Sequence, residues 1–322
     1  MVQELAKRII ADAVDKYVTD LYLVPRTQSY ELYERYDDER VFVGKYDEAE
    51  FAALISHFKF MAGMNVGEKR RSQQGSCDYD YGKGTISLRL STVGDYRNKE
   101  SLVIRFLYEG VHDLRYWFNA LEEVSQEIKG RGLYLFSGPV GSGKTTLMYH
   151  LARLKFPKQQ VLTIEDPVEI KQDDMLQLQL NEAIGATYDN LIKLSLRHRP
   201  DLLIIGEIRD QETARAVIRA SLTGATVFST VHAKSISGVY ARLLELGVRE
   251  EELKNALQGI AYQRLIKGRG IVDYANRDYQ EHSNRKWNEQ IDQLLADGHI
   301  DARQAQTEKI IDFRPASGHP AL

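Results

Sequence analysis

The sequence predicts an α/β protein in which a larger parallel-sheet domain follows a small α+β domain and precedes a helical tail. Strand-like and helix-like segments alternate from about Trp117 to Gly270, which is typical of parallel sheets covered by helices. The first hundred residues instead hold several short strand-like segments and two helices. Because 322 residues exceed one typical domain, we expect domains at residues 1–112 and 113–270 and an appendage at 271–322.

The composition excludes several classes of protein. The formal net charge is only −3, so bulk charge does not indicate a nucleic-acid binder. The single cysteine, Cys77, excludes an internal disulfide framework and a multi-cysteine zinc site. No apolar run approaches membrane-spanning length, and the first residues lack a signal-peptide core. We therefore expect a cytoplasmic protein that reaches any membrane only from the water side.

Amphipathic patterns predict the elements of the first domain. Residues 2–17 and 48–61 place apolar side chains at helical spacing, and segments of alternating apolar and polar residues are typical of half-buried strands. Residues 73–75 are interpreted as a turn. The expected strands are Leu21–Val24, Ser29–Arg35, Arg40–Val43, Ile86–Leu90 and Leu102–Phe106.

Two arginines of this domain lie inside apolar strands. Arg89 and Arg105 are on facing strands of a predicted hairpin, and Arg97 lies in the loop between them. One interpretation is that both strand arginines are solvated on an outward face. The other is that they stabilise the phosphate charge of a nucleotide bound by the neighbouring domain. The residue pattern alone does not decide between the two.

Continuous apolar runs predict the strands of the second domain. Functional residues are expected where parallel strands end, at the carboxyl edge of the sheet. The expected strands are Leu133–Ser137, Val161–Ile164, Leu202–Ile205 and Thr226–Thr230, with a shorter one at Leu176–Leu180.

A complete phosphate-binding loop follows the first of these strands. Gly138 is followed by four residues and then by Gly143, Lys144 and Thr145, and a helical pattern begins directly after them. Glycines allow backbone N–H groups to surround a phosphate, and the lysine places a charge between the β- and γ-phosphates. We expect ATP to bind Gly138, Pro139, Val140, Gly141, Ser142, Gly143, Lys144, Thr145 and Thr146, with the Thr145 hydroxyl as a ligand of Mg²⁺.

Glu165 and Asp166 end the strand at residues 161–164. Carboxylates at this edge lie beside the phosphate loop, where Glu165 and Asp166 can hold Mg²⁺ or its water ligands. The alternative is an ordinary acidic turn, since Asp166 and Pro167 are both good turn formers.

Glu207 follows the apolar strand Leu202–Ile205. Many phosphate-loop enzymes have a metal-binding aspartate one position earlier, but this chain has Gly206 there. Glu207 is therefore expected to act as the general base that orients and deprotonates the attacking water. The alternative is a carboxylate at the start of the helix predicted at Gln211–Leu222.

His232 closes the strand at Thr226–Thr230. A single histidine is commonly a hydrogen-bonded structural residue. At the carboxyl edge beside the phosphate loop it could instead sense the γ-phosphate, and the sequence leaves both interpretations open.

In their order along the chain, these motifs resemble the ATPases of type II secretion and type IV pilus systems over about residues 5–265. The long N-terminal domain and four-cysteine zinc module of the larger members are absent, so the chain is most similar to the competence pilus ATPases of Gram-positive bacteria. The tail, with Trp287, Ile291 and Leu294 at helical spacing, fits this compact outline as a helical hairpin. The matching segments are Gly138–Thr146, Thr163–Glu169, Arg199–Ala214 and Ser229–Ala233.

The resemblance implies a RecA-like ATPase domain behind a small PAS-like domain, assembled as a homo-hexamer. It implies a motor that hydrolyses ATP with Mg²⁺ at the inner face of the cell membrane and acts on an inner-membrane platform protein, with no zinc and no direct contact to nucleic acid. It also favours the interpretation that Arg89 and Arg105 contact nucleotide over the interpretation that they are solvated. Arg97 is a weaker candidate for such a contact. Glu207, Glu165 and His232 take the catalytic positions of the family.

Three alternatives to a motor for competence pilus assembly remain at this point. A pilus retraction ATPase and a type II secretion ATPase share the same chemistry. A nucleotide-gated scaffold would bind ATP without turnover, although Lys144 and Glu207 argue against it. Direct translocation of DNA is not supported, because the sequence has no basic tract with interleaved aromatic residues.

Overall fold

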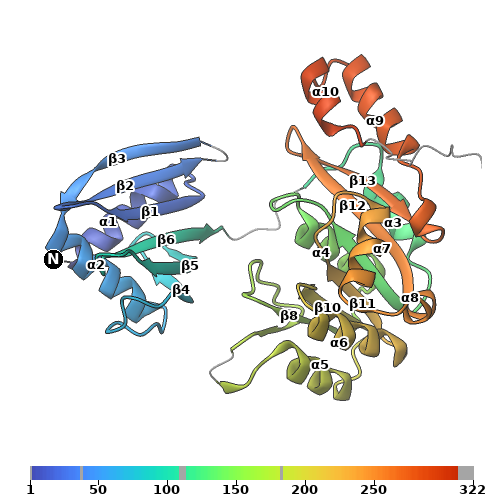
Figure 1. Cartoon of the computed structure of the whole chain (residues 1–322), viewed down its shortest axis with the longest axis horizontal. Helices are drawn as coiled ribbons and strands as arrows, with labels where there is room; N and C mark the ends of the chain where they lie inside the picture. Colours follow the sequence, from blue (N-terminus) through green and yellow to red (C-terminus); the bar gives the residue numbers. More distant parts are fainter. Residues whose placement is uncertain (1, 37–38, 109–113, 182–183, 311–322) are drawn as a thin grey trace, which may run out of the picture. The chain divides into compact units, whose positions relative to one another are not determined.

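The structure, a computed structural model, describes residues 2–36, 39–108, 114–181 and 184–310. The chain divides into two compact units, Met1–Gly110 and Val111–Leu322, whose elements are labelled in Figure 1. The predicted boundary between residues 112 and 113 lies outside the described residues.

The first unit is a six-stranded antiparallel sheet with two helices on one face (Figure 1). Its strand order is β3-β2-β1-β6-β5-β4, and alternate strand residues form one hydrophobic core with both helices. The elements are α1 (Val2–Asp15), β1 (Asp20–Pro25), β2 (Ser29–Tyr36), β3 (Glu39–Asp47), α2 (Glu48–Met61), β4 (Gln73–Asp80), β5 (Thr85–Gly94) and β6 (Glu100–Leu107).

The two helices and five expected strands of this unit are confirmed, but the turn predicted at residues 73–75 is wrong. These residues begin β4, which pairs with β5 along its whole length. Gly75 is needed there for a close approach of the backbone, because a Cβ atom would lie 2.6 Å from the carbonyl oxygen of Ala62. The sequence did not predict β4 because the polar, half-exposed residues of this edge strand show no alternation of apolar and polar side chains.

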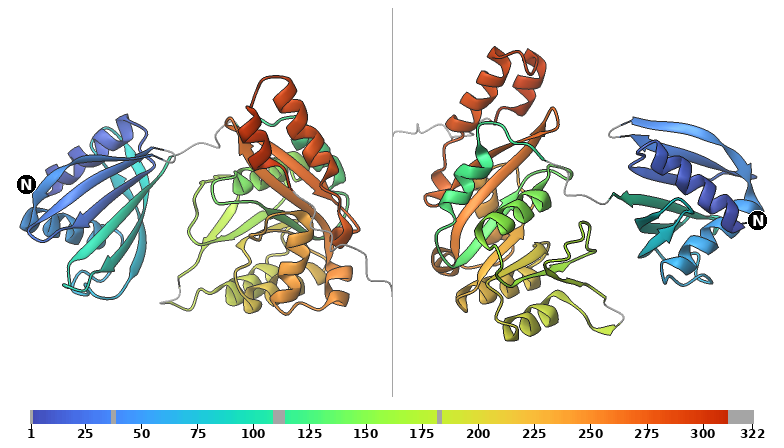
Figure 2. Two further views of the ribbon diagram at one scale, coloured as in Figure 1. Left: turned by 45° about the horizontal axis from the view of Figure 1, so that its top comes forward. Right: turned by 180° about the vertical axis from the view of Figure 1, so that it is seen from behind.

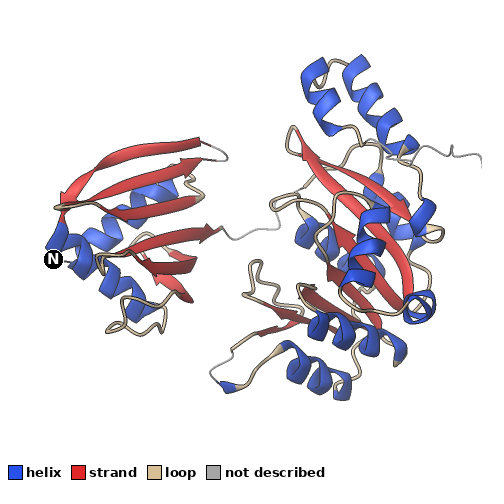
Figure 3. Ribbon diagram, in the orientation of Figure 1, coloured by secondary structure: helices blue, strands red, loops and turns tan. Residues whose placement is uncertain are grey.

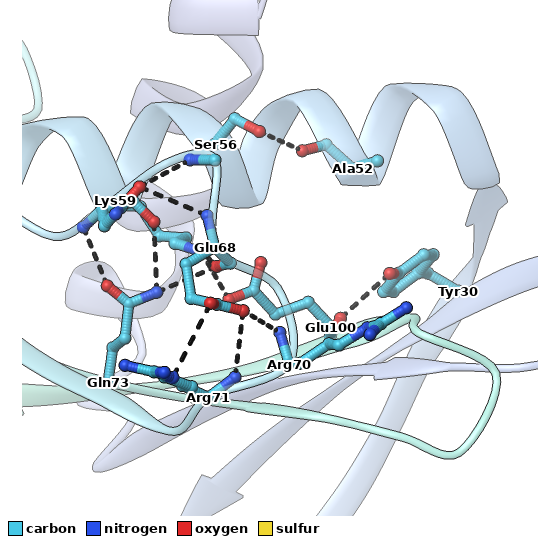
Figure 4. Close-up of polar contacts among 11 residues, drawn as sticks. Tyr30, Ala52, Ser56, Lys59, Glu68, Arg70, Arg71, Gln73 and Glu100 are labelled. Atoms are coloured by element: carbon cyan, nitrogen blue, oxygen red, sulfur yellow. Dashed lines mark hydrogen bonds and ion pairs between the residues drawn. The ribbon is translucent and has the colours of Figure 1, made fainter.

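A buried ion pair fixes the loop that leads into β4 (Figure 4). The Lys59 side chain on α2 is fully buried, and its Nζ donates to Glu100 Oε1 and to the Glu68 carbonyl oxygen, each at 2.6 Å. Gln73 closes the loop from the other side by donating to the same Glu68 carbonyl at 3.0 Å. The buried ammonium group thus has a carboxylate and a carbonyl as partners, and the Glu68 carbonyl accepts two hydrogen bonds, so these buried polar groups are satisfied.

We expect Lys59→Met to destabilise the first unit by about 3 kcal/mol, because Glu100 would remain buried without its cation. The measurement is hydrogen exchange of α2 amides in the full chain. The control is Lys83→Met, which removes an exposed pair with Asp15 and should leave the exchange of the α2 amides nearly unchanged. Equal losses in the two variants would show that the buried pair does not hold the unit together.

The second unit contains a seven-stranded sheet of order β13-β12-β7-β11-β10-β8-β9. All neighbours are parallel except β13, which runs antiparallel to β12. The parallel sheet is as predicted, and the hairpin β12–β13 adds two strands that the sequence pattern did not indicate. The strands are β7 (Gly132–Ser137), β8 (Val161–Glu165), β9 (Leu176–Gln179), β10 (Leu202–Glu207), β11 (Thr226–Thr230), β12 (Leu257–Ile266) and β13 (Arg269–Ala275).

Helices cover both faces of this sheet (Figures 2 and 3). Two of them pack on one face and the others on the opposite face, with successive strand residues alternating between the two cores. Every residue of β7, β8 and β11 is therefore buried. The helices are α3 (Ala120–Glu127), α4 (Lys144–Lys155), α5 (Tyr188–Arg197), α6 (Gln211–Leu222), α7 (Ile236–Glu245), α8 (Glu250–Ala256), η2 (Tyr279–Glu281), α9 (Arg285–Ala296) and α10 (Ala302–Glu308).

The helices α9 and α10 form the predicted helical hairpin at the end of the second unit. Trp287 anchors it: the side chain is fully buried, packs edge-on against Tyr262 and donates its indole N–H to the Glu308 carbonyl at 2.8 Å. The hairpin thus shares the core of the sheet.

The chain enters the second unit along the β12–β13 turn. Gly270 donates its N–H to Arg115 and accepts from Trp117 through its carbonyl, both at 2.8 Å. The Trp117 indole donates to the Ile266 carbonyl at 3.1 Å, and the Arg269 guanidinium stacks 4.0 Å above the Trp117 ring. Residues 115–117, which come before β7 in the chain, are therefore attached to the β12–β13 hairpin.

Candidate functional site

The glycine-rich loop connects the end of β7 to the start of α4, as the sequence predicts. Gly138, Gly141 and Gly143 have φ values of +146°, +77° and +81°, which residues with a Cβ atom rarely adopt. At Gly138 a Cβ atom would also lie 2.1 Å from the carbonyl oxygen of Gln263 on β12. The loop can therefore turn sharply only because glycine occupies this position.

The start of α4 offers backbone donors to an anion. The N-cap residue is Gly143, and no side chain within the described part of the chain caps the helix there. The first N–H groups of a helix have no partner inside the helix, and the helix dipole adds positive charge at the same end. This arrangement is suited to binding a phosphate group.

Lys144 is folded back onto the loop. Its Nζ donates to the carbonyl oxygens of Gly138 at 3.0 Å and Pro139 at 2.8 Å. Burial lowers the pKa of Lys144, while the negative charges of Glu207 and Glu169 oppose this shift. The ammonium group thus lies in a partly dehydrated position with two carboxylates nearby, where a phosphate would compete with the loop carbonyls for it.

A backbone irregularity directs Glu207 at the end of β10. The register between β10 and β11 shifts between Ile205 and Glu207, and the Gly206 carbonyl accepts a hydrogen bond from Thr230 Oγ1 at 2.7 Å. A Cβ atom at Gly206 would lie 3.1 Å from the Tyr188 hydroxyl, tighter than an ordinary contact. Bulges of this kind re-aim side chains next to active sites, and here the bulge positions the carboxylate.

The predicted residues Glu207, His232 and Gly138 are joined by direct contacts. His232 Nε2 lies 3.2 Å from Glu207 Oε1, and His232 Nδ1 lies 3.2 Å from the Gly138 carbonyl oxygen. A neutral imidazole has a single N–H, so both contacts are hydrogen bonds only when the pair carries an additional proton. His232 thus connects the candidate base to the phosphate loop.

Glu165, the other predicted acid, is held from within the protein. Its Oε1 accepts hydrogen bonds from Thr163 at 2.6 Å, Tyr149 at 2.7 Å and Gln177 at 3.3 Å. Burial raises the pKa of Glu165, although these three donors oppose the shift. Glu165 ends β8 at the predicted edge of the sheet, and its role toward a metal ion stays a prediction.

Arg89 and Arg105 belong to the first unit. They are directly opposite each other in the β5–β6 ladder, on the sheet face away from the helices, since Leu88 and Ile104 enter the core. Arg105 Nε donates to Asp20 Oδ1 at 2.8 Å while half of the side chain stays exposed. Their expected contact with nucleotide remains a prediction, as does that of Arg97, which forms an ion pair with Asp95 at 2.7 Å.

Sequence reasoning assigned no role to Arg209 or Glu169, and it considered Asp166 only as a possible ligand of Mg²⁺. Arg209 Nε donates to Glu207 Oε2 at 2.9 Å, and its Nη1 lies 3.6 Å from Asp166 Oδ2. The hydrogen bond to Glu207 raises the pKa of Arg209. The available signal was position: each residue follows a buried strand by no more than four residues, at the edge where charged side chains converge.

The fold and the site define a class of protein. A glycine-rich loop ends a buried parallel strand, its lysine faces the loop, and a glutamate ends a strand of the same sheet close to that lysine. This combination is that of a phosphate-loop ATPase.

Comparison with known proteins places the chain within this class. It belongs to the Type II/IV secretion system protein family, whose model matches residues 1–300. It is 70% identical over 310 residues to the competence protein ComGA of Streptococcus pneumoniae (strain ATCC BAA-255 / R6), covering 96% of this chain and 99% of that protein. It is 36% identical over 272 residues to the competence protein ComGA of Bacillus subtilis (strain 168), covering 82% and 76%.

Solved structures agree with the fold. The pilus retraction motor PilT with bound ADP superposes with a TM-score of 0.72 at 22% identity, covering 95% of this chain and 97% of that chain. Membership of the family, shown by the family model and by the sequence relatives, makes the chain an ATP-hydrolysing enzyme of the secretion and pilus ATPases.

Proposed function

We propose that this protein is a hexameric, Mg²⁺-dependent ATPase that powers assembly of a competence pilus for DNA uptake. The observation that carries the proposal is the set of contacts joining Glu207, His232 and the phosphate loop at one edge of the sheet. The similarity to ComGA of Streptococcus pneumoniae, over nearly the whole of both chains, supports the competence assignment.

In the proposed reaction, the loop and the first turn of α4 bind the phosphates of ATP. Lys144 leaves the carbonyls of Gly138 and Pro139 and moves to the β- and γ-phosphates. Glu207 takes a proton from the attacking water, and the products are ADP and phosphate. His232 is placed to register the γ-phosphate, because it contacts both the loop and the base.

Mg²⁺ fits the oxygen donors of this edge, because hydroxyl and carboxylate oxygens are the ligands it prefers. Thr145 and Glu165 would hold the ion together with the phosphates of the substrate, and the bound ion would neutralise part of the phosphate charge. Burial lowers the pKa of Lys144, and the charges of Glu207 and Glu169 oppose this shift, so acidic oxygens lie close to the loop.

Movement in the proposed motor comes from the first unit. Arg89 and Arg105 would contact the phosphates when the units close around ATP, and release of product would open them again. Around a homo-hexamer these steps would act on a platform protein at the inner face of the cell membrane, with the motor itself in the cytoplasm. Within the ranges that the structure describes, no helix is long and apolar enough to span a bilayer.

The test is deletion of the gene in the source organism, with DNA uptake and protein secretion assayed separately. Loss of DNA uptake with unchanged secretion is expected, and complementation by the intact gene should restore uptake. The reverse pattern would assign the motor to secretion. Oligomer mass with a non-hydrolysable ATP analogue tests the ring directly, with six subunits as the expected state.

A further inference from the structure

Both carboxylate oxygens of Glu207 lie next to side-chain nitrogen atoms of the protein itself. Arg209 Nε donates to Oε2 at 2.9 Å, and His232 Nε2 lies 3.2 Å from Oε1. A carboxylate oxygen has few acceptor positions. A water molecule that approaches Oε2 must therefore compete with the Arg209 guanidinium for that oxygen.

A second carboxylate lies within reach of the same guanidinium. Arg209 Nη1 is 3.6 Å from Asp166 Oδ2, beyond hydrogen-bond distance but close enough for a small rotation to complete the contact. The exposed side-chain fractions are 54% for Arg209, 38% for Asp166 and 21% for Glu207. Because all three groups keep contact with water, exchanging one partner for the other costs little.

We propose that Arg209 is a positioning residue that exchanges between Glu207 and Asp166. While Arg209 is paired with Glu207, it restrains the base; when it turns to Asp166, the Oε2 atom of Glu207 becomes available to the attacking water. The exchange rests on the proposed function, since it has a role only if Glu207 is the base. By this exchange, Asp166 at the end of β8 would determine whether Glu207 at the end of β10 is free of Arg209.

The place of Arg209 in the chain suits this role. It lies two residues beyond the end of β10 and one residue before Asp210, whose side chain caps α6 by accepting from the Thr213 N–H at 2.8 Å. The strand end and the helix cap fix the backbone on both sides. The side chain can therefore move between two acceptors without movement of the sheet.

Three variants test the exchange in the full-length protein: Arg209→Gln, Asp166→Asn and the double variant. Steady-state ATP hydrolysis gives kcat and KM, and a fluorescent ATP analogue gives the nucleotide Kd. We expect Arg209→Gln to raise kcat by about threefold or more, and Asp166→Asn to lower it by about tenfold, because the guanidinium then keeps a single partner. Kd should stay within about twofold in all three variants.

The double variant provides the decisive comparison. Without Arg209, loss of Asp166 should have no further effect, so kcat of the double variant should match that of Arg209→Gln. A merely structural role for Asp166 would instead lower kcat in both backgrounds. A fall in kcat for Arg209→Gln, or a decrease that persists in the double variant, would overturn the exchange.

Two controls keep this test separate from the proposed function. Arg219→Gln removes an arginine of α6 that lies 2.9 Å from Asp189. This ion pair is away from the phosphate loop, so the substitution should leave kcat, KM and Kd unchanged. Glu207→Gln is measured in parallel. If Glu207→Gln keeps its turnover, the proposed base is wrong; if it is inactive while Arg209→Gln is not faster than the parent, only the exchange fails.

Discussion

Replacement of Glu207 by Gln should leave ATP binding intact while kcat falls roughly a hundredfold to ten-thousandfold. Glutamine fills the same volume and can still contact Arg209 and His232, but it cannot accept a proton from water. The measurements are the nucleotide Kd from a fluorescent analogue and kcat from steady-state phosphate release.

Retained turnover in this variant would remove Glu207 from the role of base. A parallel loss of binding would point instead to a structural role at the end of β10, where the carboxylate contacts Arg209 and His232. Lys144→Ala serves as the contrasting variant, because loss of its ammonium group should weaken ATP binding itself.

Gly138→Ala should weaken ATP binding about a hundredfold, because the new Cβ atom has no room in the loop. It would lie 2.1 Å from the carbonyl oxygen of Gln263 and 2.7 Å from Ser142 Oγ, and φ is +146°. A strained backbone of this kind costs about 3 kcal/mol, and moving the loop to relieve it converts that strain into lost affinity.

Gly141→Ala is the matched control in the same loop. Its φ is +77°, but a Cβ atom there meets no other atom within 4 Å. Only the left-handed backbone opposes this change, at about 1 to 2 kcal/mol, so the loss of affinity should be about tenfold. Equal losses at the two positions would show that the contact with β12 is not the reason for glycine at Gly138.

The fold was predictable from the sequence where the spacing of apolar residues and the residues that begin or end an element indicate the same helix or strand. Residues 48–61 form α2 with the predicted bounds, and Asp47 caps the helix by accepting from the Ala49 N–H at 2.8 Å. Strand β12 was not predicted because it is buried on both faces and includes the buried Gln263, so its residues show neither alternation nor a purely apolar run. Strand β13 was not predicted either, because its sequence alone does not indicate the antiparallel pairing with β12.

The candidate site was predictable in its position more than in its contacts. The carboxyl-edge rule correctly placed Glu207 and His232 beside the loop. It could not indicate that Arg209 holds Glu207, because a charged residue two positions after a strand equally fits a solvated turn. The pairing of Arg105 with Asp20 joins residues that are 85 positions apart, and no local pattern contains that information.

The attachment of residues 115–117 to Gly270 has a mechanical consequence. Two backbone hydrogen bonds, an indole contact and a stacked guanidinium fasten this short segment beside β13. The bridge between Tyr116 and Gly270 is parallel. Tension that reaches Arg115 along the chain would therefore be borne by several contacts with the β12–β13 hairpin before it reaches β7.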